Sequence, residues 1–401
     1  MNNFNVLRKM NNNKEREHFQ ISDIEKFAIK ALIKSGYPEE AAKATAFVLL
    51  EADKRGIFSH GLVGGTGLEE AVRRTGLFTP VVPEATPKIL PRKYSAIAII
   101  NGNLAPGHIT SLLAVDLVKK LARKNGMAKV FVNNASHFGA AGVYSELIAK
   151  EKDLIGTVTC TTSPLVKTMG DDPEGLDYTK GAGKKLRLGT NPIAISVPHS
   201  DGILTMDMAL TKMAANYCIK AYKTKELLTI PEYVADENYK STLDPQEFIS
   251  IKDGKQFVKG SVFPLGSTHT GYKGDALLRM IEVEHSIAGG AIEKADITSK
   301  DNRISLAFQA QVIDCLYTKE EAQNRVRKLM EDYETKYFGS ATRWPGDRSK
   351  KALEYSTKEG IPYNEGQVGM FRRTATIVGL NFDEMVKSLG KKSFPSDIFR
   401  K

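Results

Sequence analysis

The sequence predicts a mixed α/β protein, and three observations lead to that class. Short apolar runs alternate with segments of helical spacing through the middle of the chain. Charged helical patterns dominate after about Cys315. The glycine fingerprint of a Rossmann domain is absent, because Gly65-Thr66-Gly67 follows a predicted helix and lacks the third glycine. The predicted fold class is therefore α/β (α+β) of a non-Rossmann type.

Two helices are predicted at the start of the folded chain. Ser22 followed by Glu25 has the spacing of a capping box, so a helix is expected to begin at Ser22. Apolar residues keep a helical spacing from there until Gly36, a typical C-terminal stop. The second helix has Pro38 in its first turn and runs towards Gly56.

The middle of the chain alternates predicted strands and helices. Apolar runs of strand length occupy residues 95–100, 128–132, 154–160, 192–197 and 203–206. Helical spacing occupies residues 108–124, 140–152 and 272–287. Two polar segments, 167–185 and 232–259, interrupt this order and are interpreted as surface loops or a small subdomain. Residues 1–20 are interpreted as a flexible polar extension.

Composition excludes several classes of protein. With 401 residues, 41% of them hydrophobic, the chain can bury a large core, while its longest apolar runs are too short to cross a membrane. The three cysteines are too few and scattered for a disulfide framework, and no secretory signal is recognisable, so a cytoplasmic setting is expected. The net charge of +10 is spread along the chain with acidic residues interleaved, which favours a small anionic ligand over nucleic acid.

Two short turns carry histidines that suit proton-transfer chemistry. Ser59-His60-Gly61 follows the end of the second predicted helix. Ser136-His137-Phe138-Gly139 follows a predicted strand and precedes a helix, a junction where backbone amides commonly meet ligands. Taken singly, each histidine is about as well explained by a structural hydrogen bond as by catalysis. Spacing alone does not decide between them.

Together with their neighbours, these turns resemble the malate/L-lactate dehydrogenase-like family, which also includes ureidoglycolate dehydrogenases and ketimine or diketogulonate reductases. The resemblance extends from about Ile21 to Leu380, and seven blocks keep the family's order. They are Glu51-Ala52-Asp53 with Arg55-Gly56, Ser59-His60-Gly61, Ser136 to Gly142, Thr162 to Val166, Leu188 to Ala194, Asp207-Met208-Ala209, and Pro264-Leu265-Gly266 with Gly271-Tyr272-Lys273-Gly274.

The resemblance implies a largely antiparallel sheet domain that binds NAD or NADP, beside a helical domain formed by both chain ends. On this basis residues 21–90 with 316–401 are expected to form the helical domain, and residues 91–315 the cofactor-binding domain. The implied activity is hydride transfer between a small 2-hydroxy acid and its 2-oxo acid, in a homodimer. No metal is implied.

The resemblance also implies roles for individual residues. His137 is the first candidate for the acid/base and His60 the second, while Ser59 is expected to bind the substrate oxygen. Asp207 is expected to orient an imidazole or bind the cofactor, with a helix cap near Ala209 as an equally weighted alternative. The residues expected to bind the cofactor are Thr162, Ser163, Thr190, Asn191, Met208, Ala209, Gly271, Lys273 and Gly274.

The sequence departs from the family pattern where the substrate is expected. Gly64 stands in place of an arginine that would fork onto a carboxylate, a loss that typically costs about 2 to 5 kcal/mol of binding. Lys54 and Arg55 are the candidate substitutes in this chain. Asp275 replaces a usual aromatic and Tyr217 a usual lysine. A non-catalytic or substrate-diverged dinucleotide-binding protein is therefore the alternative hypothesis.

Overall fold

The computed structural model describes residues 15–74, 80–169, 182–224, 227–252, 255–288, 304–337 and 343–399. It divides into two compact units, one formed by Met1–Arg74 with Arg343–Lys401 and the other by Thr75–Thr342. Both chain ends thus share one unit. Residues 80–90 and 316–337 belong to the second unit, where helix α10 (Lys319–Asp332) packs against strand β8 (Ile193–His199).

The unit of the two chain ends is helical, with one small sheet. Its helices are α2 (Ile21–Lys34), α3 (Glu39–Lys54), α4 (Leu68–Arg73), α11 (Asp347–Glu359), α12 (Glu365–Ile377), α13 (Phe382–Met385) and α14 (Ser396–Phe399). The antiparallel sheet has the order β16-β1-β17, from Ile361–Tyr363, Glu15–Phe19 and Ser388–Ser393. An aromatic cluster of Phe27, Phe371 and Phe382 joins residues from both ends of the chain, with ring centroids 5.0 to 6.0 Å apart.

Two predictions for this unit are wrong in detail. Residues 15–19 are not part of a flexible extension, because their backbone groups pair with β16 and β17. The capping box at Ser22 does not form, since helix α2 begins at Ile21 and its N-cap, Gln20, makes no side-chain cap. The predicted stops at Gly36 and Gly56 are confirmed, and both glycines have positive φ angles, 96° and 72°.

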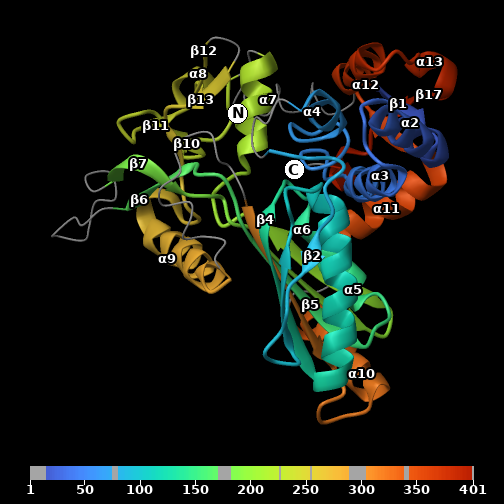
Figure 1. Cartoon of the computed structure of the whole chain (residues 1–401), viewed down its shortest axis with the longest axis vertical. Helices are drawn as coiled ribbons and strands as arrows, with labels where there is room; N and C mark the ends of the chain where they lie inside the picture. Colours follow the sequence, from blue (N-terminus) through green and yellow to red (C-terminus); the bar gives the residue numbers. More distant parts are fainter. Residues whose placement is uncertain are drawn as a thin grey trace. The chain divides into compact units, whose positions relative to one another are not determined.

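A seven-stranded sheet organises the second unit (Figure 1). Its order is β2-β3-β4-β15-β5-β8-β9, and every neighbouring pair is antiparallel except β3 with β4. The strands not yet bounded are β2 (Lys88–Ile89), β3 (Ile97–Asn101), β4 (Met127–Ala135), β5 (Leu154–Thr161), β9 (Gly202–Met208) and β15 (Ile304–Val312). All five strands predicted from apolar runs are confirmed, and the sheet is largely antiparallel, as the resemblance implied.

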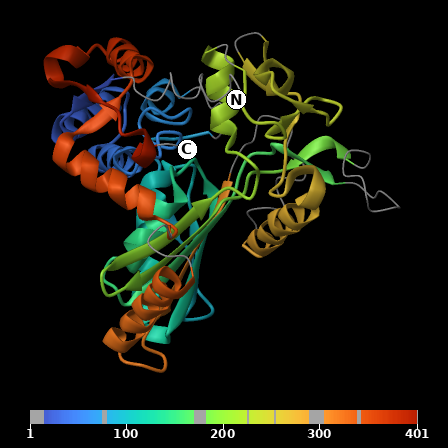
Figure 2. The ribbon, with the colours of Figure 1, turned by 180° about the vertical axis from the view of Figure 1, so that it is seen from behind.

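Helices cover both faces of this sheet (Figures 1 and 2). Helices α5 (Gly107–Asn125) and α6 (Ala141–Ala149) pack side by side on one face, where Gly156 lets α6 approach β5 closely. Helix α9 (Ser267–Ser286) lies on the opposite face, because its His285 bonds to Thr159, whose side chain alternates with Gly156 along β5. Among the described residues, no helix is long and apolar enough to cross a membrane.

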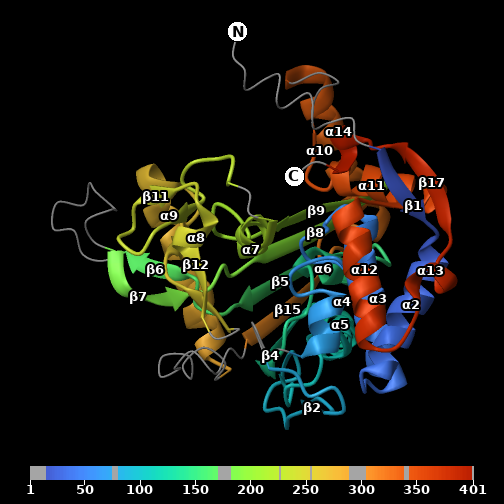
Figure 3. The same ribbon diagram turned by 90° about the horizontal axis from the view of Figure 1, so that it is seen from above.

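The two polar insertions contribute to a small subdomain with a core of its own (Figure 3). Strands β6 (Val166–Met169) and β7 (Ala182–Leu188) come from the first insertion, and residues 170–181 lie outside the described part. The second contains β10 (Val234–Ala235), β11 (Ser241–Thr242), α8 (Pro245–Phe248), β12 (Ile249–Lys252) and β13 (Lys255–Val258). These pack with β14 (Ser261–Val262) and α7 (Ala215–Thr224). Since Val234, Phe248 and Tyr239 are buried, the second insertion is not merely a surface loop.

Candidate active site

The sheet brings most of the predicted site residues of the second unit to one end. Ala135, at the end of β4, pairs with Ile304, and the next residue of β15 pairs with Thr161 at the end of β5. On the other side of β5, Ile193 at the start of β8 pairs with Met208 at the end of β9. The turns after β4, β5 and β9 and the turn before β8 therefore lie together at one end of the sheet, where these strands begin or end.

Hydrogen bonds to backbone groups hold the side chains of Ser136 and His137 in the second histidine turn. The Ser136 hydroxyl donates to the carbonyls of Pro80 and Leu104, at 2.6 and 3.2 Å. The Gly139 amide donates to Nδ1 of His137 at 3.2 Å, so the neutral ring carries its proton on Nε2. Burial lowers the pKa of His137 to about 4, and the ring is therefore neutral at pH 7.

Asp207 bonds to the first turn of α6, the helix that follows the His137 turn. Its Oδ2 accepts from the Gly142 amide at 3.0 Å, which ties the end of β9 to the first turn of α6. A Cβ on Gly142 would lie 2.8 Å from that oxygen, so only glycine allows this approach. The alternative cap near Ala209 is wrong, because the next helix, α7, begins at Ala215.

Thr162, Thr190 and Asn191 form one hydrogen-bonded cluster between β5 and β8. The Thr162 hydroxyl accepts from the Thr190 amide at 2.8 Å, and the Thr162 amide donates to Asn191 Oδ1 at 3.0 Å. Asn191 is fully buried, and its Nδ2 donates to the Leu278 carbonyl and to Glu282, both on α9. The Asn191 side chain thus connects the Thr162 backbone to α9.

The remaining predicted cofactor residues are placed differently from one another. Ser163 is buried beside Thr162, whereas Met208 is 36% exposed, and Ala209 is half-buried. The α9 residues Gly271, Lys273 and Gly274 follow a break in that helix at Thr270, whose φ is −130°. Gly274 permits α9 to approach the Leu265 backbone, because a Cβ there would lie 2.4 Å from its carbonyl oxygen. Lys273 is exposed and its Nζ lies 5.8 Å from the centre of the Tyr272 ring.

The first histidine turn belongs to the other unit. Ser59 Oγ and His60 Nδ1 are 2.9 Å apart, and both side chains are partly exposed. The turn rests on Asp53, which is fully buried and accepts from the Leu62 amide at 3.2 Å and the Tyr363 hydroxyl at 2.7 Å. Burial raises the pKa of Asp53 well above its usual range. Asp53, the last residue of the Glu51-Ala52-Asp53 block, thus supports the first histidine turn.

The backbone around Gly64 leaves no space for the arginine side chain of the family pattern. A Cβ at this position would lie 2.4 Å from the Ser59 carbonyl oxygen. The turn after His60 therefore closes over Gly64, and no side chain fits there without moving it. The candidate substitutes are also engaged, since Lys54 and Arg55 both pair with Glu51.

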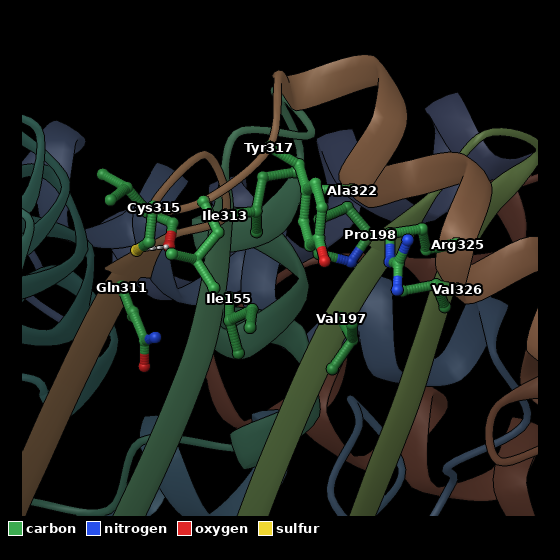
Figure 4. A pocket seen from close by; sticks show the side chains of 12 residues that line it. Ile155, Val197, Pro198, Gln311, Ile313, Cys315, Tyr317, Ala322, Arg325 and Val326 are labelled. Atoms are coloured by element: carbon green, nitrogen blue, oxygen red, sulfur yellow. Dashed lines mark hydrogen bonds between the residues drawn. The ribbon is translucent and has the colours of Figure 1, made fainter.

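A separate cavity of about 300 Å³ lies at the other end of the sheet (Figure 4). Ile155 and Val197 contribute from β5 and β8, and Ala322 and Val326 from α10. The same strands reach the predicted site at Thr161 and Ile193, so the cavity is several residues away along each strand. It contains none of the predicted site residues.

Sequence reasoning missed His108, in the first turn of α5. The ring is only 5% exposed, and neither nitrogen has a hydrogen-bond partner among the described residues. In the sequence, only the pair Gly107-His108 at the start of a predicted helix pointed to this residue. Such a pair is too common to identify a site by itself. In the described part of the chain, no group of three or more His, Cys, Asp or Glu side chains is arranged to hold a metal ion.

Comparisons with known proteins define the class to which this fold and these turns belong. A malate/(S)-sulfolactate dehydrogenase of Methanothermus fervidus is 30% identical over 357 residues, which covers 86% of this chain and 94% of that protein. An L-sulfolactate dehydrogenase of Methanothermobacter thermautotrophicus is 31% identical over 340 residues, covering 82% and 87%. The solved sulfolactate dehydrogenase of Methanocaldococcus jannaschii matches with a TM-score of 0.71 at 26% identity, covering 92% and 99%.

The class is thus that of dehydrogenases acting on a CH–OH group. The chain belongs to the malate/L-lactate dehydrogenase family, whose sequence pattern matches residues 19–370. Ureidoglycolate dehydrogenase of Escherichia coli and a diketogulonate reductase of Mannheimia succiniciproducens are further relatives. The family resemblance seen in the sequence is confirmed.

Proposed function

We propose that this protein is an NAD(P)-dependent dehydrogenase that interconverts a small 2-hydroxy acid and its 2-oxo acid, with His137 as the acid/base. The observation that carries the proposal is the convergence of the His137 turn, Asp207 and the Thr162 cluster at one end of the sheet. A nicotinamide cofactor, when bound, takes the hydride in oxidation or supplies it in reduction.

His137 is suited to exchange the hydroxyl proton. Its low pKa leaves the ring neutral at pH 7, the state that accepts a proton when the alcohol is oxidised. The lone pair of the resting ring is on Nδ1 and accepts from Gly139. An imidazolium has no such lone pair, so proton uptake is coupled to loss of that bond. Asp207, at the end of β9, accepts from the Gly142 amide in the first turn of α6. It thereby fixes the start of the helix that directly follows the His137 turn.

The residues at this end of the sheet fit a dinucleotide. The Thr162 and Thr190 hydroxyls are only partly buried and stand at strand ends, where short donors suit ribose and phosphate oxygens. Ser163 follows Thr162 in the chain, and the amide of Leu210, directly after Met208 and Ala209, donates to the Thr190 carbonyl at 3.0 Å. Lys273, exposed after the break in α9 between Gly271 and Gly274, provides a cation for a phosphate. We assign cofactor contact to these residues and a supporting role to Asn191.

We propose a substrate of the malate or sulfolactate type, an acid with a second anionic group. The support is that the relatives aligned over 86% and 82% of this chain bear those names. The family arginine is absent at Gly64, so recognition of the first carboxylate must use another cation. Ser59 is proposed to bind the substrate oxygen, as the resemblance implies, and its Oγ lies 2.9 Å from Nδ1 of His60, the second candidate for the acid/base.

A substrate panel tests this function. Malate, sulfolactate, lactate and ureidoglycolate are to be supplied with NAD or NADP, and reduced cofactor is followed by its absorbance. We expect turnover with at least one of the two dianionic acids and at least tenfold lower kcat/KM with lactate, because a paired anion contributes more than 1.4 kcal/mol. Lactate as the best substrate would contradict the proposed specificity, and no turnover with any acid would contradict the activity.

We further propose a homodimer, as the resemblance implies. Helix α9 supports it, because Met280, Val283 and Ile287 are 63%, 58% and 77% exposed and lie on one side of the helix. Contiguous apolar surface of this kind usually contacts a partner. We expect sedimentation velocity to give twice the chain's mass of 44.1 kDa at micromolar concentration. A monomer that persists as concentration rises would contradict the proposal.

One observation favours a second candidate, a cofactor-binding protein without turnover. Gly64 removes the family cation, and the nearby Lys54 and Arg55 are held by Glu51. Such a protein would bind NADH with normal affinity while the substrate panel stayed inactive.

A further inference from the structure

His108 is a buried imidazole whose hydrogen-bonding capacity is unmet within the described protein. Neither Nδ1 nor Nε2 has a partner there, although the side chain is only 5% exposed. Buried polar groups are nearly always paired with protein or with ordered water. His285 shows the usual arrangement, since its two nitrogens lie 2.9 and 3.0 Å from the hydroxyls of Thr159 and Ser305. The His108 ring thus differs from a structural histidine of the same unit.

Ser111 lies one turn further along α5. It is fully buried, and its hydroxyl, which interacts with the Tyr144 phenol, can accept a second hydrogen bond. Residues three apart on a helix share a face, so His108 and Ser111 point to the same side of α5. The phenol of Tyr144 on α6 lies near Ser111 and donates its own proton to the Phe138 carbonyl. Phe138 directly follows His137 in the chain.

The first turn of α5 lies directly against the His137 turn. A Cβ on Gly107 would lie 2.3 Å from the Ser136 carbonyl oxygen and 2.5 Å from that of His137. Glycine at this position therefore allows the helix start to touch the backbone of both residues. His108 follows Gly107, and it is close enough to His137 that charge on the one ring opposes charge on the other.

In the described part of the chain, no acidic side chain influences the pKa of His108. Burial first, and then His137, lower the pKa of His108 to about 3. Strand β15 has no titratable side chain, and Lys129 of β4 pairs with Glu284. Helix α6 carries Glu146 as well as Tyr144, and neither acts on His108. Both imidazoles are therefore neutral at pH 7, each able to donate one hydrogen bond and accept one.

We propose that His108 and Ser111 hold an ordered water molecule against the His137 imidazole, which makes His108 a positioning residue for the acid/base. The inference rests on the proposed role of His137. The water links the unmet nitrogens of His108 to the His137 ring and fixes its orientation, in the way that outer partners orient reactive histidines elsewhere. It also stabilises the imidazolium that forms when His137 takes up the substrate proton.

A pair of substitutions separates hydrogen bonding from packing. His108→Leu keeps most of the volume but binds no water, whereas His108→Gln keeps one donor and one acceptor. We expect His108→Leu to lower kcat by about ten- to a hundredfold with the KM for cofactor unchanged, and His108→Gln to restore most of the loss. We also expect His108→Leu to unfold at the same temperature or higher, because leucine needs no hydrogen-bond partner at this buried position. Ser111→Ala should lower kcat less, in the same direction.

Nuclear magnetic resonance of ¹⁵N-histidine-labelled protein tests the inference independently of turnover. At pH 7 the ring nitrogen signals of His137, assigned by their loss in His137→Gln, should shift in His108→Leu and stay near their original positions in His108→Gln. Unchanged signals in His108→Leu would overturn the inference. Equal loss of kcat in the leucine and glutamine variants would also overturn it, because shape rather than hydrogen bonding would then matter. If the parent enzyme is inactive but the His137 signals still shift in His108→Leu, only the proposed function is refuted.

Discussion

His137→Gln is expected to lower kcat for hydroxy-acid oxidation by about 10²- to 10⁴-fold, the usual contribution of a positioned acid/base. Glutamine occupies similar volume and can still accept from the Gly139 amide, but it does not take up a proton near neutral pH. Cofactor affinity should remain unchanged, because His137 is proposed to act on the substrate proton. Steady-state kinetics and a fluorescence titration with NADH measure the two quantities.

His199→Gln is the matched control for this variant. His199 is also buried in the second unit, and its Nδ1 accepts from the amide two residues later, Asp201, at 3.3 Å. It lies at the other end of β8 from the predicted site, so its replacement should leave kcat within about twofold of the parent. Loss of turnover in His60→Gln but not in His137→Gln would transfer the acid/base role to His60.

The same low pKa of His137 governs the pH dependence of catalysis. Oxidation requires the neutral ring, so kcat/KM should rise with pH through about 4 and show no further dependence on this group above about pH 5. Reduction requires the protonated ring and should fall as pH rises above about 4. A rise in oxidation centred near the ordinary histidine value of about 6.5 would show that burial does not act on the catalytic ring.

Acidification from pH 7 to pH 5 is expected to destabilise the fold by about 2 kcal/mol for His108 alone. The unfolded chain binds a proton at each histidine below about pH 6.5, while the folded state holds His108 and His137 neutral until pH falls to about 3 and 4. Because the unfolded state then binds more protons, stability falls as pH falls. His137, whose pKa in the folded state is about 4, contributes in the same direction.

Urea midpoints at pH 7, 6 and 5 measure this loss. His108→Gln should reduce the slope, because glutamine does not titrate there. His18, whose pKa is also lowered by burial, contributes to the same pH range. Asp53 has the opposite sign, since burial raises its pKa and the stability of its neutral form is lost as pH rises. A urea midpoint that is constant between pH 7 and 5 would contradict a neutral, buried His108.

Local patterns predicted the elements of this protein well. Strands such as β4 and β5 appear as apolar runs because both of their faces are buried, and α5 appears as a helix because its apolar residues recur at helical spacing. The capping box at Ser22 failed because a cap depends on where the backbone first turns, and the helix that follows β1 has its N-cap two residues earlier, at Gln20.

The candidate site was predictable only in part. Family order in the sequence pointed to His137, Asp207 and Thr162, and the strand register places these residues at one end of the sheet. Family order also pointed to Asn191, which is fully buried and bonds to α9. A sequence records which residue types are present, but not which of their polar atoms are already satisfied.

The sequence by itself determined the alternation of strands and helices, the non-Rossmann class and the family, because these depend on periodicity and on the order of short blocks along the chain. Only the tertiary structure decided that Gly107 touches the His137 turn, that Gly64 has no room for a side chain, and that His108 is buried without a partner among the described residues. Those properties depend on distances between residues far apart in sequence. Close packing sets these distances, and no local pattern encodes them.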